Sequence, residues 1–524
     1  MAHAPKKQSQ MLWLPGRSVT RFLPRFLATE GFAVASAEAR AYHDDILDRD
    51  DWWLYRAGAI CRLRSSDGVR SIELVPLPPS DVAAGISEVL EGPRTKFPHE
   101  VPGKIVGARL RECMPTPKLG VRAGLDAEEK RYLVTAGDGE SFELDVFAGV
   151  LRAGGPRSDF TEVQVGLIRG KVKAFKRLVS VLVDKLNMTP VSGDVLVHRM
   201  SSVGVGLPEF VERDDLIICE DDRFVDAAYR VFRRHFGRML WHEPGTRLGL
   251  DPEHLHDMRV ATRRMRAALR VFGDALPQRR VESLRRNLRW LGGTLGAVRD
   301  LDVYSIHLAE ELPQVSEELQ PALDIYRAHL VRQRAKARRD LLKTLETKRY
   351  ASFVKHLRGF LDAGAPIRPR APRASEPVTA AADQLIRKKL DKVLEHARSL
   401  NPQSADSRLH SLRIRCKRLR YACEFFTDLY GKPAVKFASR VTALQDALGD
   451  HQDAVVARAT LSRFSETLSA PAKMRRTLHM AMGHLMAQHA ERAREGRARF
   501  FRLRKHFDRK KVRKPLLSRI QEYK

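Results

Sequence analysis

The strongest constraint on how this 524-residue chain can fold is a segment that occurs twice. Residues 256–272 read HDMRVATRRMRAALRVF and residues 410–426 read HSLRIRCKRLRYACEFF, at a constant offset of 154 without a gap. Two later segments repeat at offsets of 153 and 155, namely LGAVRDLDV from residue 295 with LGDHQDAVV from residue 448, and HLVRQRAKARR from residue 329 with HLMAQHAERAR from residue 484. Three matches in the same order at a nearly constant spacing indicate a duplicated structural unit.

Each copy of this segment is predicted to form an amphipathic helix. In the first copy, residues spaced alternately four and three apart form an apolar stripe, which is typical of a buried helix face. The members of this stripe are Met258, Thr262, Met265, Leu269 and Phe272. A second stripe is cationic or protonatable in both copies, with His256, Arg259, Arg263, Arg266 and Arg270 in the first, and His410, Arg413, Lys417 and Arg420, followed by Glu424, in the second.

The second stripe has almost only one sign of charge. Like charges one helical turn apart repel by a few tenths of a kcal/mol, so exposed helices usually mix acids with bases. A single basic helix is compatible with an ordinary solvated face. Because the stripe is kept in two copies while the core residues differ, we expect it to bind a polyanion.

The net charge of +30 is concentrated in the same part of the chain. Residues 1–200 hold 29 Lys and Arg against 25 Asp and Glu, whereas residues 201–524 hold 65 against 39. The C-terminal three-fifths is therefore the part expected to bind a polyanion. With 43% hydrophobic residues, the chain is expected to fold into two or three domains.

Neither the cysteines nor the apolar runs indicate an extracellular or membrane protein. The five cysteines fit no disulfide framework and no CxxC metal pattern, and they are Cys61, Cys113, Cys219, Cys416 and Cys423. No run of 18 apolar residues and no signal peptide is evident. We therefore expect a cytoplasmic protein that has no membrane span and needs no metal or cofactor.

The first 200 residues predict short strands separated by Gly and Pro, with a helix over 171–186. Six segments occur in the order YHDD, RAG, CRLR, IELV, FELDV and FTEVQVGLIRG, beginning at residues 42, 56, 61, 72, 142 and 160. Together they resemble the CYTH, or triphosphate tunnel, fold. The resemblance implies a closed antiparallel β-barrel of eight strands, whose charged interior holds a triphosphate and a divalent metal.

This region departs from the CYTH pattern where catalysis would occur. The opening ExExK signature is absent, Val75 replaces an expected lysine, and Glu162 alone remains of the late acids, with Gln164 and Gly166 in the other places. Metal-assisted phosphoanhydride cleavage needs several oxygen ligands, so we expect a degenerate, inactive domain with no catalytic residues. The resemblance matches Arg62 and Arg64 to phosphate-binding arginines and Asp145 to an acid, although a polar strand face explains them equally well. An active triphosphatase is the alternative.

The remainder of the chain predicts helices, among them 224–241, 281–295, 301–311 and 321–345, with a turn over 244–251. Asp251 is expected to cap the repeated helix, with Pro252 at its first position. The pattern HxxR[VI]xx[RK]RxR occurs twice, each time followed about 40 residues later by LGxxxD. This doubled pattern closely resembles the CHAD, or conserved histidine α-helical, domain. The family implies two pseudo-twofold-related four-helix bundles whose basic residues line a groove that binds inorganic polyphosphate.

The predicted fold class is therefore a multidomain α+β protein, with a CYTH-like antiparallel β-barrel followed by an all-α CHAD domain. The predicted parts are a degenerate CYTH-like domain at 1–200, a linker at 201–222, a first bundle at 223–365, a Pro/Arg-rich linker at 366–377, a second bundle at 378–510 and a basic tail at 511–524.

The cationic stripes provide the candidate ligands of polyphosphate. The strongest candidates are Arg259, Arg263, Arg266, Arg413, Lys417 and Arg420, whereas Arg270, opposite Glu424, is the weakest. Arg264 and Arg418 point elsewhere on the helix, where they either bind phosphate or pair with Asp300 and Asp453 as structural links. His256 and His410 are interpreted as hydrogen-bond donors to phosphate, with a structural role as the alternative.

The family suggests recruitment to polyphosphate granules. Nucleic acid is the alternative ligand, expected to bind more weakly and without sequence preference. Against it, aromatic residues make up only 7% of the chain, and Tyr421 is the one aromatic beside the cationic stripes. The sequence does not indicate an oligomeric state.

Overall fold

The computed structural model describes residues 9–16, 19–36, 39–77, 85–90, 103–114, 118–137, 139–191, 195–210, 216–467 and 472–522. The chain divides into two compact units, of which the first comprises residues 1–210 with 241–255 and the second comprises residues 211–240 with 256–524. None of the described helices has an apolar stretch long enough to cross a lipid bilayer.

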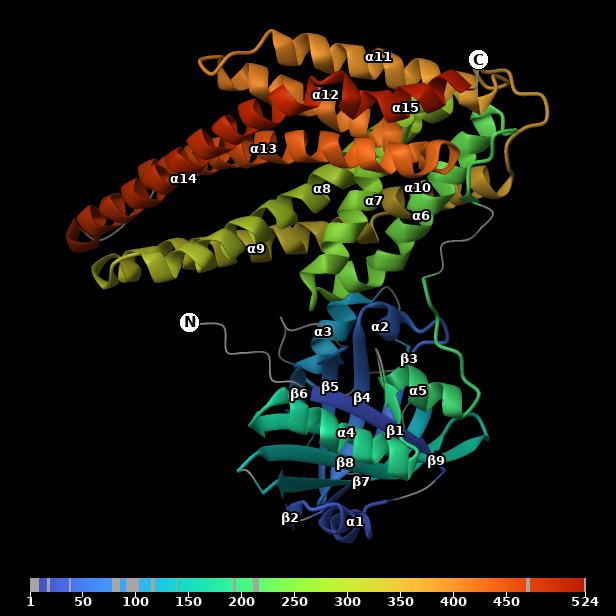
Figure 1. Ribbon diagram of the computed structural model, residues 1–524, viewed down its shortest axis with the longest axis vertical. Helices are drawn as coiled ribbons and strands as arrows, with labels where there is room; N and C mark the ends of the chain where they lie inside the picture. Colours follow the sequence, from blue (N-terminus) through green and yellow to red (C-terminus); the bar gives the residue numbers. More distant parts are fainter. Residues whose placement is uncertain are drawn as a thin grey trace. The chain divides into compact units, whose positions relative to one another are not determined.

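The first unit is built on one antiparallel sheet (Figure 1). Its strands are β1 (Ser9–Pro15), β2 (Ala33–Ser36), β3 (Arg40–Asp48), β4 (Ala59–Ser66), β5 (Val69–Pro76), β6 (Ile86–Val89), β7 (Gly120–Thr135), β8 (Ser141–Arg152), β9 (Arg157–Arg169) and β10 (Thr189–Val191). Their order is β10-β1-β9-β8-β7-β3-β4-β5-β6, and β2 pairs with β7. The predicted antiparallel β fold is confirmed, although no pairing within the described residues joins the end strands β6 and β10.

Five helices accompany this sheet in the described ranges: α1 (Leu23–Thr29), α2 (Trp53–Arg56), α3 (Val106–Cys113), α4 (Val172–Leu186) and α5 (Val195–Ser202). The predicted helix over 171–186 is confirmed as α4, which buries Phe175, Leu178 and Leu182 in one apolar cluster with strands of the sheet. Helix α5 packs in a different cluster, where Leu196 and Met200 join Tyr42 and Phe160. The position of α5 brings one of its arginines to the charged residues of the sheet.

The second unit is helical, as predicted, and its long helices lie side by side (Figure 1). The helices are α6 (Phe224–Leu248), α7 (Pro252–Val271), α8 (Gln278–Glu311), α9 (Gln320–Glu346), α10 (Lys348–Asp362), α11 (Val378–Arg398), α12 (Asp406–Phe425), α13 (Thr427–Thr467), α14 (Ala472–Phe507) and α15 (Lys510–Glu522). The ends of α6 and α7 that meet at their connection belong to the first unit. By sequence offset, α6 to α9 correspond to α11 to α14.

Two predicted helix boundaries are wrong. The expected turn over 244–251 is largely helical, since α6 continues through Pro244 to Leu248. An ion pair of 2.8 Å from Arg247 Nε to Glu243 Oε1 and complete burial of Leu248 stabilise this last turn despite the missing proline N–H. Segments 281–295 and 301–311 form the single helix α8, because its buried apolar positions continue past Gly296.

The start of α7 agrees with the sequence. Pro252 is its first residue, and the backbone N–H of Glu253 donates to Asp251 Oδ1 at 2.8 Å. The segment 366–377 is not helical, as its prolines predict. The predicted basic tail contains most of α15, which buries Leu516 and Ile520.

Candidate anion-binding site

The cationic stripes of the two repeated helices, α7 and α12, come together in the second unit. Burial, together with the smaller effects of the neighbouring Arg413 and Arg263, lowers the pKa of Lys417 to about 8. Burial also lowers the pKa of Arg263, to which Arg259 of its own helix and Arg420 of the other helix contribute. These half-buried side chains therefore experience a strongly positive potential to which both copies contribute.

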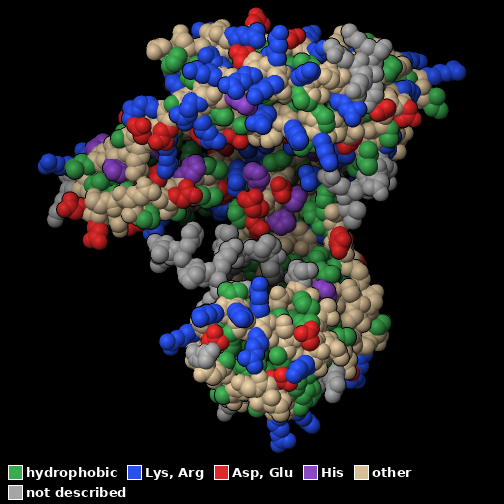
Figure 2. Space-filling view, in the orientation of Figure 1, with side chains coloured by type: hydrophobic (Ala, Val, Ile, Leu, Met, Phe, Trp, Pro, Cys, Tyr) green, Lys and Arg blue, Asp and Glu red, His purple; other side chains and the backbone are tan. Residues whose placement is uncertain are grey.

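We call these side chains the shared cationic surface. It comprises Arg259, Arg263, Arg266 and Arg270 of α7 and Arg413, Lys417, Arg418 and Arg420 of α12, together with His256 and His410. In Figure 2, Lys and Arg side chains gather on the upper part of the helical unit, in the region of α11, α12, α13 and α15. Most members of the surface are half-buried, whereas Arg270 and Arg418 are exposed.

Two equivalent ion pairs flank the shared cationic surface. Arg259 Nη2 lies 3.7 Å from Asp300 Oδ1, and Arg413 Nη2 lies 3.4 Å from Asp453 Oδ1. The two aspartates are 62% and 64% exposed, so solvent weakens both pairs to about 0–1 kcal/mol each. Both aspartates close the LGxxxD pattern.

The glycines of that pattern lie beneath the arginines. A Cβ at Gly296 would lie 3.7 Å from Arg259 Nε, and one at Gly449 would lie 3.6 Å from Arg413 Nε. Each arginine therefore crosses the following helix at its glycine before reaching the aspartate one turn further on. This explains why the repeated helix and the LGxxxD pattern recur together.

Two roles were left open for Arg264 and Arg418, and the one in which they pair with Asp300 and Asp453 is wrong. Those aspartates form ion pairs with Arg259 and Arg413 of the cationic stripes instead. Arg264 Nη1 donates to Glu424 Oε2 at 2.6 Å, across the two copies. Arg264 also lies over the Tyr421 ring at 5.5 Å, so it links the two repeated helices through both an ion pair and a ring contact.

Several buried donors of the surface have no hydrogen-bond partner in the part of the chain that the structure describes. They are the Nε–H groups of Arg263, Arg413 and Arg420; the ring nitrogen Nδ1 of His410, which donates in one of its two tautomers, also has no partner there. A buried donor without a partner costs about 1–3 kcal/mol. Phosphate oxygens are acceptors that satisfy such groups. His256, the equivalent of His410, is also half-buried.

Cations of other helices also lie near the shared cationic surface, and they were not among the residues predicted from the sequence. Arg289 lies near Arg266 and lowers its pKa, after the larger effect of burial. Burial lowers the pKa of Arg270, and Arg285 lowers it by a smaller amount. Burial likewise lowers the pKa of Lys389 of α11, and Arg418 adds to this effect. Arg285 and Arg289 lie one turn apart on α8. This spacing could have identified them from the sequence, but they lie outside the repeated segment.

In the first unit, each residue that the CYTH resemblance matched to a phosphate or metal ligand is paired with another side chain of opposite charge. Arg64 donates twice to the buried Asp44 at 2.8 Å, and Arg62 Nη2 lies 2.7 Å from Glu73. These pairs are cross-strand, since Asp44 is opposite Arg64 and Glu73 is opposite Arg62. Asp145 accepts from Arg131 at 2.6 Å.

Glu162 is the least exposed acid of this region, at 1% exposure. Both of its oxygens accept from Arg199 of α5, at 2.6 and 2.5 Å. The Glu162 and Arg62 charges are thus balanced within the protein. The sequence did not indicate a role for Arg199, because α5 supplies this side chain from 37 residues further along the chain.

Comparison with known families decides the identity of the helical part. Residues 230–462 match the family model of the CHAD domain. The chain contains a CHAD domain. The prediction made from the doubled pattern is confirmed, and the match includes both repeated helices and both LGxxxD segments.

Other known proteins are similar to parts of this chain. An uncharacterised protein of Mycobacterium tuberculosis is 29% identical over 213 residues, which span 39% of this chain and 39% of that protein. The crystal structure of a CHAD domain from the plant Ricinus communis is 28% identical and covers 56% of this chain and 96% of its own, with a TM-score of 0.46. Part of the chain is also similar to a putative adenylyl cyclase from Hippeastrum that is described as having a dominant triphosphatase activity, at 12% identity over 38% of this chain and 98% of that chain, with a TM-score of 0.22.

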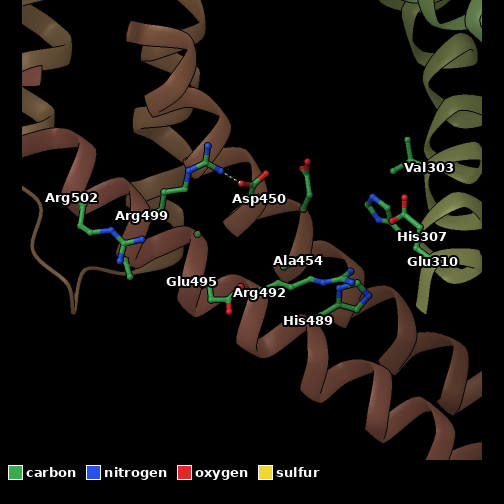
Figure 3. Close-up of a pocket in the computed structure, with 13 residues that line it drawn as sticks. Val303, His307, Glu310, Asp450, Ala454, His489, Arg492, Glu495, Arg499 and Arg502 are labelled. Atoms are coloured by element: carbon green, nitrogen blue, oxygen red, sulfur yellow. Dashed lines mark hydrogen bonds and ion pairs between the residues drawn. The ribbon is translucent and has the colours of Figure 1, made fainter. Parts of the chain in front are cut away.

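A cavity of about 760 Å³ adjoins the second LGxxxD segment of the CHAD domain (Figure 3). Helices α8, α13 and α14 line it with side chains of both charges, and Asp453 is one of them. Arg499 donates to Asp450 at 3.0 Å, and Arg492 pairs with Glu311. Because its charges are mixed and paired, this cavity suits a polyanion less well than the shared cationic surface does.

Proposed function

We propose that this protein binds inorganic polyphosphate, without cleaving it, on the shared cationic surface of its CHAD domain. One observation carries the proposal. The two copies hold like-charged side chains together at half-buried positions, where burial and repulsion lower the pKa of Arg263 and Lys417. Packing alone does not favour this arrangement, whereas a bound polyanion relieves the repulsion.

Polyphosphate fits the chemistry of these side chains. The polymer is a flexible chain of charged phosphates without bases, so its receptor needs charge density and no means of reading base edges. Arginine binds two oxygens through its planar fork and stays charged at any relevant pH. Cations on successive turns lie about 5.4 Å apart along a helix and follow the chain. Release of condensed counterions supplies most of the favourable free energy.

Nucleic acid is the alternative ligand, and the position of Tyr421 argues against single strands. Proteins that bind single strands stack bases on accessible aromatic rings. Tyr421 is only 4% exposed and lies against Arg264 and Arg420, so its ring is not available to a base. A competition assay separates the remaining possibilities. Displacement of long polyphosphate by duplex DNA at equal phosphate concentration would contradict the proposal.

The expectation that the protein does not cleave polyphosphate is based on the ion pairs of the first unit. Glu162 and Asp44 are the least exposed acids there, and arginines of the protein already bind both oxygens of each. A divalent metal needs several free oxygen ligands. We expect no phosphate release from tripolyphosphate with Mg²⁺ or Mn²⁺. Release that is lost in Glu162→Gln or Arg62→Gln would establish the triphosphatase alternative.

Charge reversal tests the binding proposal directly. The test variant carries Glu at Arg259, Arg263, Arg413 and Lys417, and its expected result is loss of polyphosphate binding with the helical circular dichroism retained. A matched control carries Glu at four exposed cations of α9, which are Arg332, Lys336, Arg339 and Lys343. Both variants change the net charge equally. Equal binding by the two folded variants would contradict the proposal.

Binding of this kind places the protein on polyphosphate granules. A fluorescently tagged protein is expected to form foci in cells that accumulate polyphosphate and to be diffuse in cells that lack it. The test variant is expected to be diffuse in both, and the control variant is expected to form foci.

A further inference from the structure

A second cavity, of about 360 Å³, lies between α8 and α10 of the helical unit. The residues that line it are not members of the shared cationic surface. Leu284 of α8 and Phe353 and Leu357 of α10 are buried and form its apolar floor. The volume falls within the range of about 300–1,000 Å³ that is typical of small-molecule sites. The cavity therefore has room for an apolar group of a small ligand.

The floor of this cavity differs between the two copies of the repeat. At the offset of 153 that relates the LGxxxD segments, Leu284 corresponds to Phe437. Phe437 is buried, and its ring lies 5.7 Å from the ring of Phe507. The cavity of the first copy thus coincides with a smaller side chain at a position that the second copy fills with an aromatic ring.

One end of the cavity holds an arginine in a fixed position. The Nε–H group of Arg349 donates to Asn287 Oδ1 at 3.1 Å, and the guanidinium lies over the Trp290 ring at 4.2 Å. In the described part of the chain, no ion pair joins Arg349 to an acid. These contacts leave its two terminal amino groups available to bind a carboxylate or a phosphate through two parallel hydrogen bonds.

The other end of the cavity is also cationic. The guanidinium of Arg280 lies 5.5 Å from the centre of the Phe360 ring, which in turn lies 4.7 Å from the Tyr229 ring. Arg280 and Asn287 are seven residues apart on α8, so the two ends are separated by about 10 Å. Among the described residues that line the cavity, none is acidic. The cavity therefore combines an apolar floor with positive charge at both ends.

We propose that this cavity binds a small amphipathic organic anion, whose carboxylate or phosphate group binds Arg349 and whose apolar body covers Leu284, Phe353 and Leu357. The site is separate from the function proposed above, because polyphosphate has no apolar part. The charged group gains hydrogen bonds from a preorganised arginine, and the apolar body displaces water from the floor. A ligand needs both parts to match the cavity.

The probe for this site is 2-naphthoate, an aromatic carboxylate, and titration calorimetry with the full chain measures its affinity. We expect one bound molecule per chain at concentrations of about 1 mM or less. The uncharged 2-naphthamide is expected to bind about tenfold more weakly, because it lacks the charged hydrogen bonds to Arg349. Inorganic phosphate, which has no apolar body, should not displace 2-naphthoate at an equal concentration.

Matched variants separate the cavity from general attraction to a basic protein. Arg349→Gln is expected to weaken binding of 2-naphthoate about tenfold. Lys348→Gln removes the same charge at an exposed neighbour that does not line the cavity, and it should leave the affinity unchanged. Leu284→Phe installs the residue of the second copy and is expected to abolish binding by filling the cavity. Ser283→Phe, at a half-buried lining position, fills the same space should Leu284→Phe fail to fold.

Three results would overturn the proposed site. They are the absence of 2-naphthoate binding to the unaltered protein, an equal loss of affinity in Lys348→Gln and Arg349→Gln, and unchanged affinity in a folded variant with Phe at position 284 or 283. Binding of anionic phospholipid vesicles without binding of 2-naphthoate would assign the cavity to a membrane surface and would also contradict the proposal. Circular dichroism checks that each variant folds, and none of these results depends on polyphosphate.

Discussion

The aromatic ring of Phe272 lies 5.5 Å from that of Phe426, with the ring planes 66° apart. These two residues occupy equivalent positions in the duplicated helices, at the offset of 154. Contact between equivalent residues places them beside the pseudo-twofold axis that relates the two copies. The shared cationic surface lies on the same two helices, so this aromatic contact holds the two stripes in register.

Phe272→Ala is expected to lower the free energy of unfolding by about 3–5 kcal/mol, as is usual when a large buried side chain is removed. The ring is completely buried and also contacts Phe224 and Phe425. Urea denaturation followed by circular dichroism measures the loss. Phe360→Ala, at a half-buried ring, is the control and should cost less. A smaller loss for Phe272 than for Phe360 would show that the contact does not join the two copies.

Binding of polyphosphate is expected to weaken as the pH rises through about 8. Lys417 has a pKa of about 8 in the folded protein, so it loses its proton as the pH rises through about 8, whereas an ordinary lysine keeps its proton until about 10.5. The neutral amine no longer attracts phosphate. Affinity measured by titration calorimetry between these pH values checks this expectation. Lys417→Arg, which restores the residue found at the equivalent Arg263, is expected to remove most of the dependence.

The same pKa predicts a change in stability. Because the folded pKa lies below the unfolded one, the charged Lys417 opposes folding at pH values below about 8, and the penalty disappears as the pH approaches 10.5. Lys417→Met is therefore expected to stabilise the ligand-free protein at neutral pH and to lose that advantage near pH 10.5. Denaturation midpoints at the two pH values measure the effect. An advantage that does not change with pH would contradict the assigned pKa.

The salt dependence of binding reports how many cations contact phosphate. Affinity is expected to fall linearly with salt on logarithmic axes, because binding releases condensed counterions. Arg263→Gln removes one cation from the centre of the surface and should reduce the slope by about one. Arg332→Gln on α9 is the control, for which the slope should not change. If the slope decreased by a similar amount in both variants, binding would depend on net charge alone.

Local sequence patterns predict the elements of this site well. The spacing of apolar and cationic residues defines two faces of one helix, and the duplication predicts that two such helices form one surface. Both features depend on residues within a few turns of each other, which sequence periodicity records.

The partners of individual side chains were less predictable, because they depend on which helix faces which. A helical wheel shows that Arg264 leaves the stripe, but it does not show that Glu424 of the other copy lies opposite. Arg270 was interpreted as the weakest candidate because its equivalent is Glu424. The structure instead places Arg270 beside Arg418, where it has a like-charged neighbour. Arg199 was missed for the same reason, since its partner Glu162 lies on a different element.

We expect the aspartates of the LGxxxD segments to compete with the proposed ligand, because Asp300 and Asp453 pair with arginines that are proposed to bind phosphate. Asp300→Asn should therefore strengthen polyphosphate binding a few-fold, since an exposed pair of this kind contributes about 0–1 kcal/mol. Asp340→Asn on α9 makes the same change in net charge at an exposed acid and is expected to have a smaller effect.

The double variant with Asn at both Asp300 and Asp453 is expected to show nearly the sum of the two single effects, because each aspartate pairs with a different arginine. Weaker binding by the double variant would mean that the aspartates hold Arg259 and Arg413 in the binding geometry. In that case, the two ion pairs prepare the cationic surface for its ligand and do not compete with it.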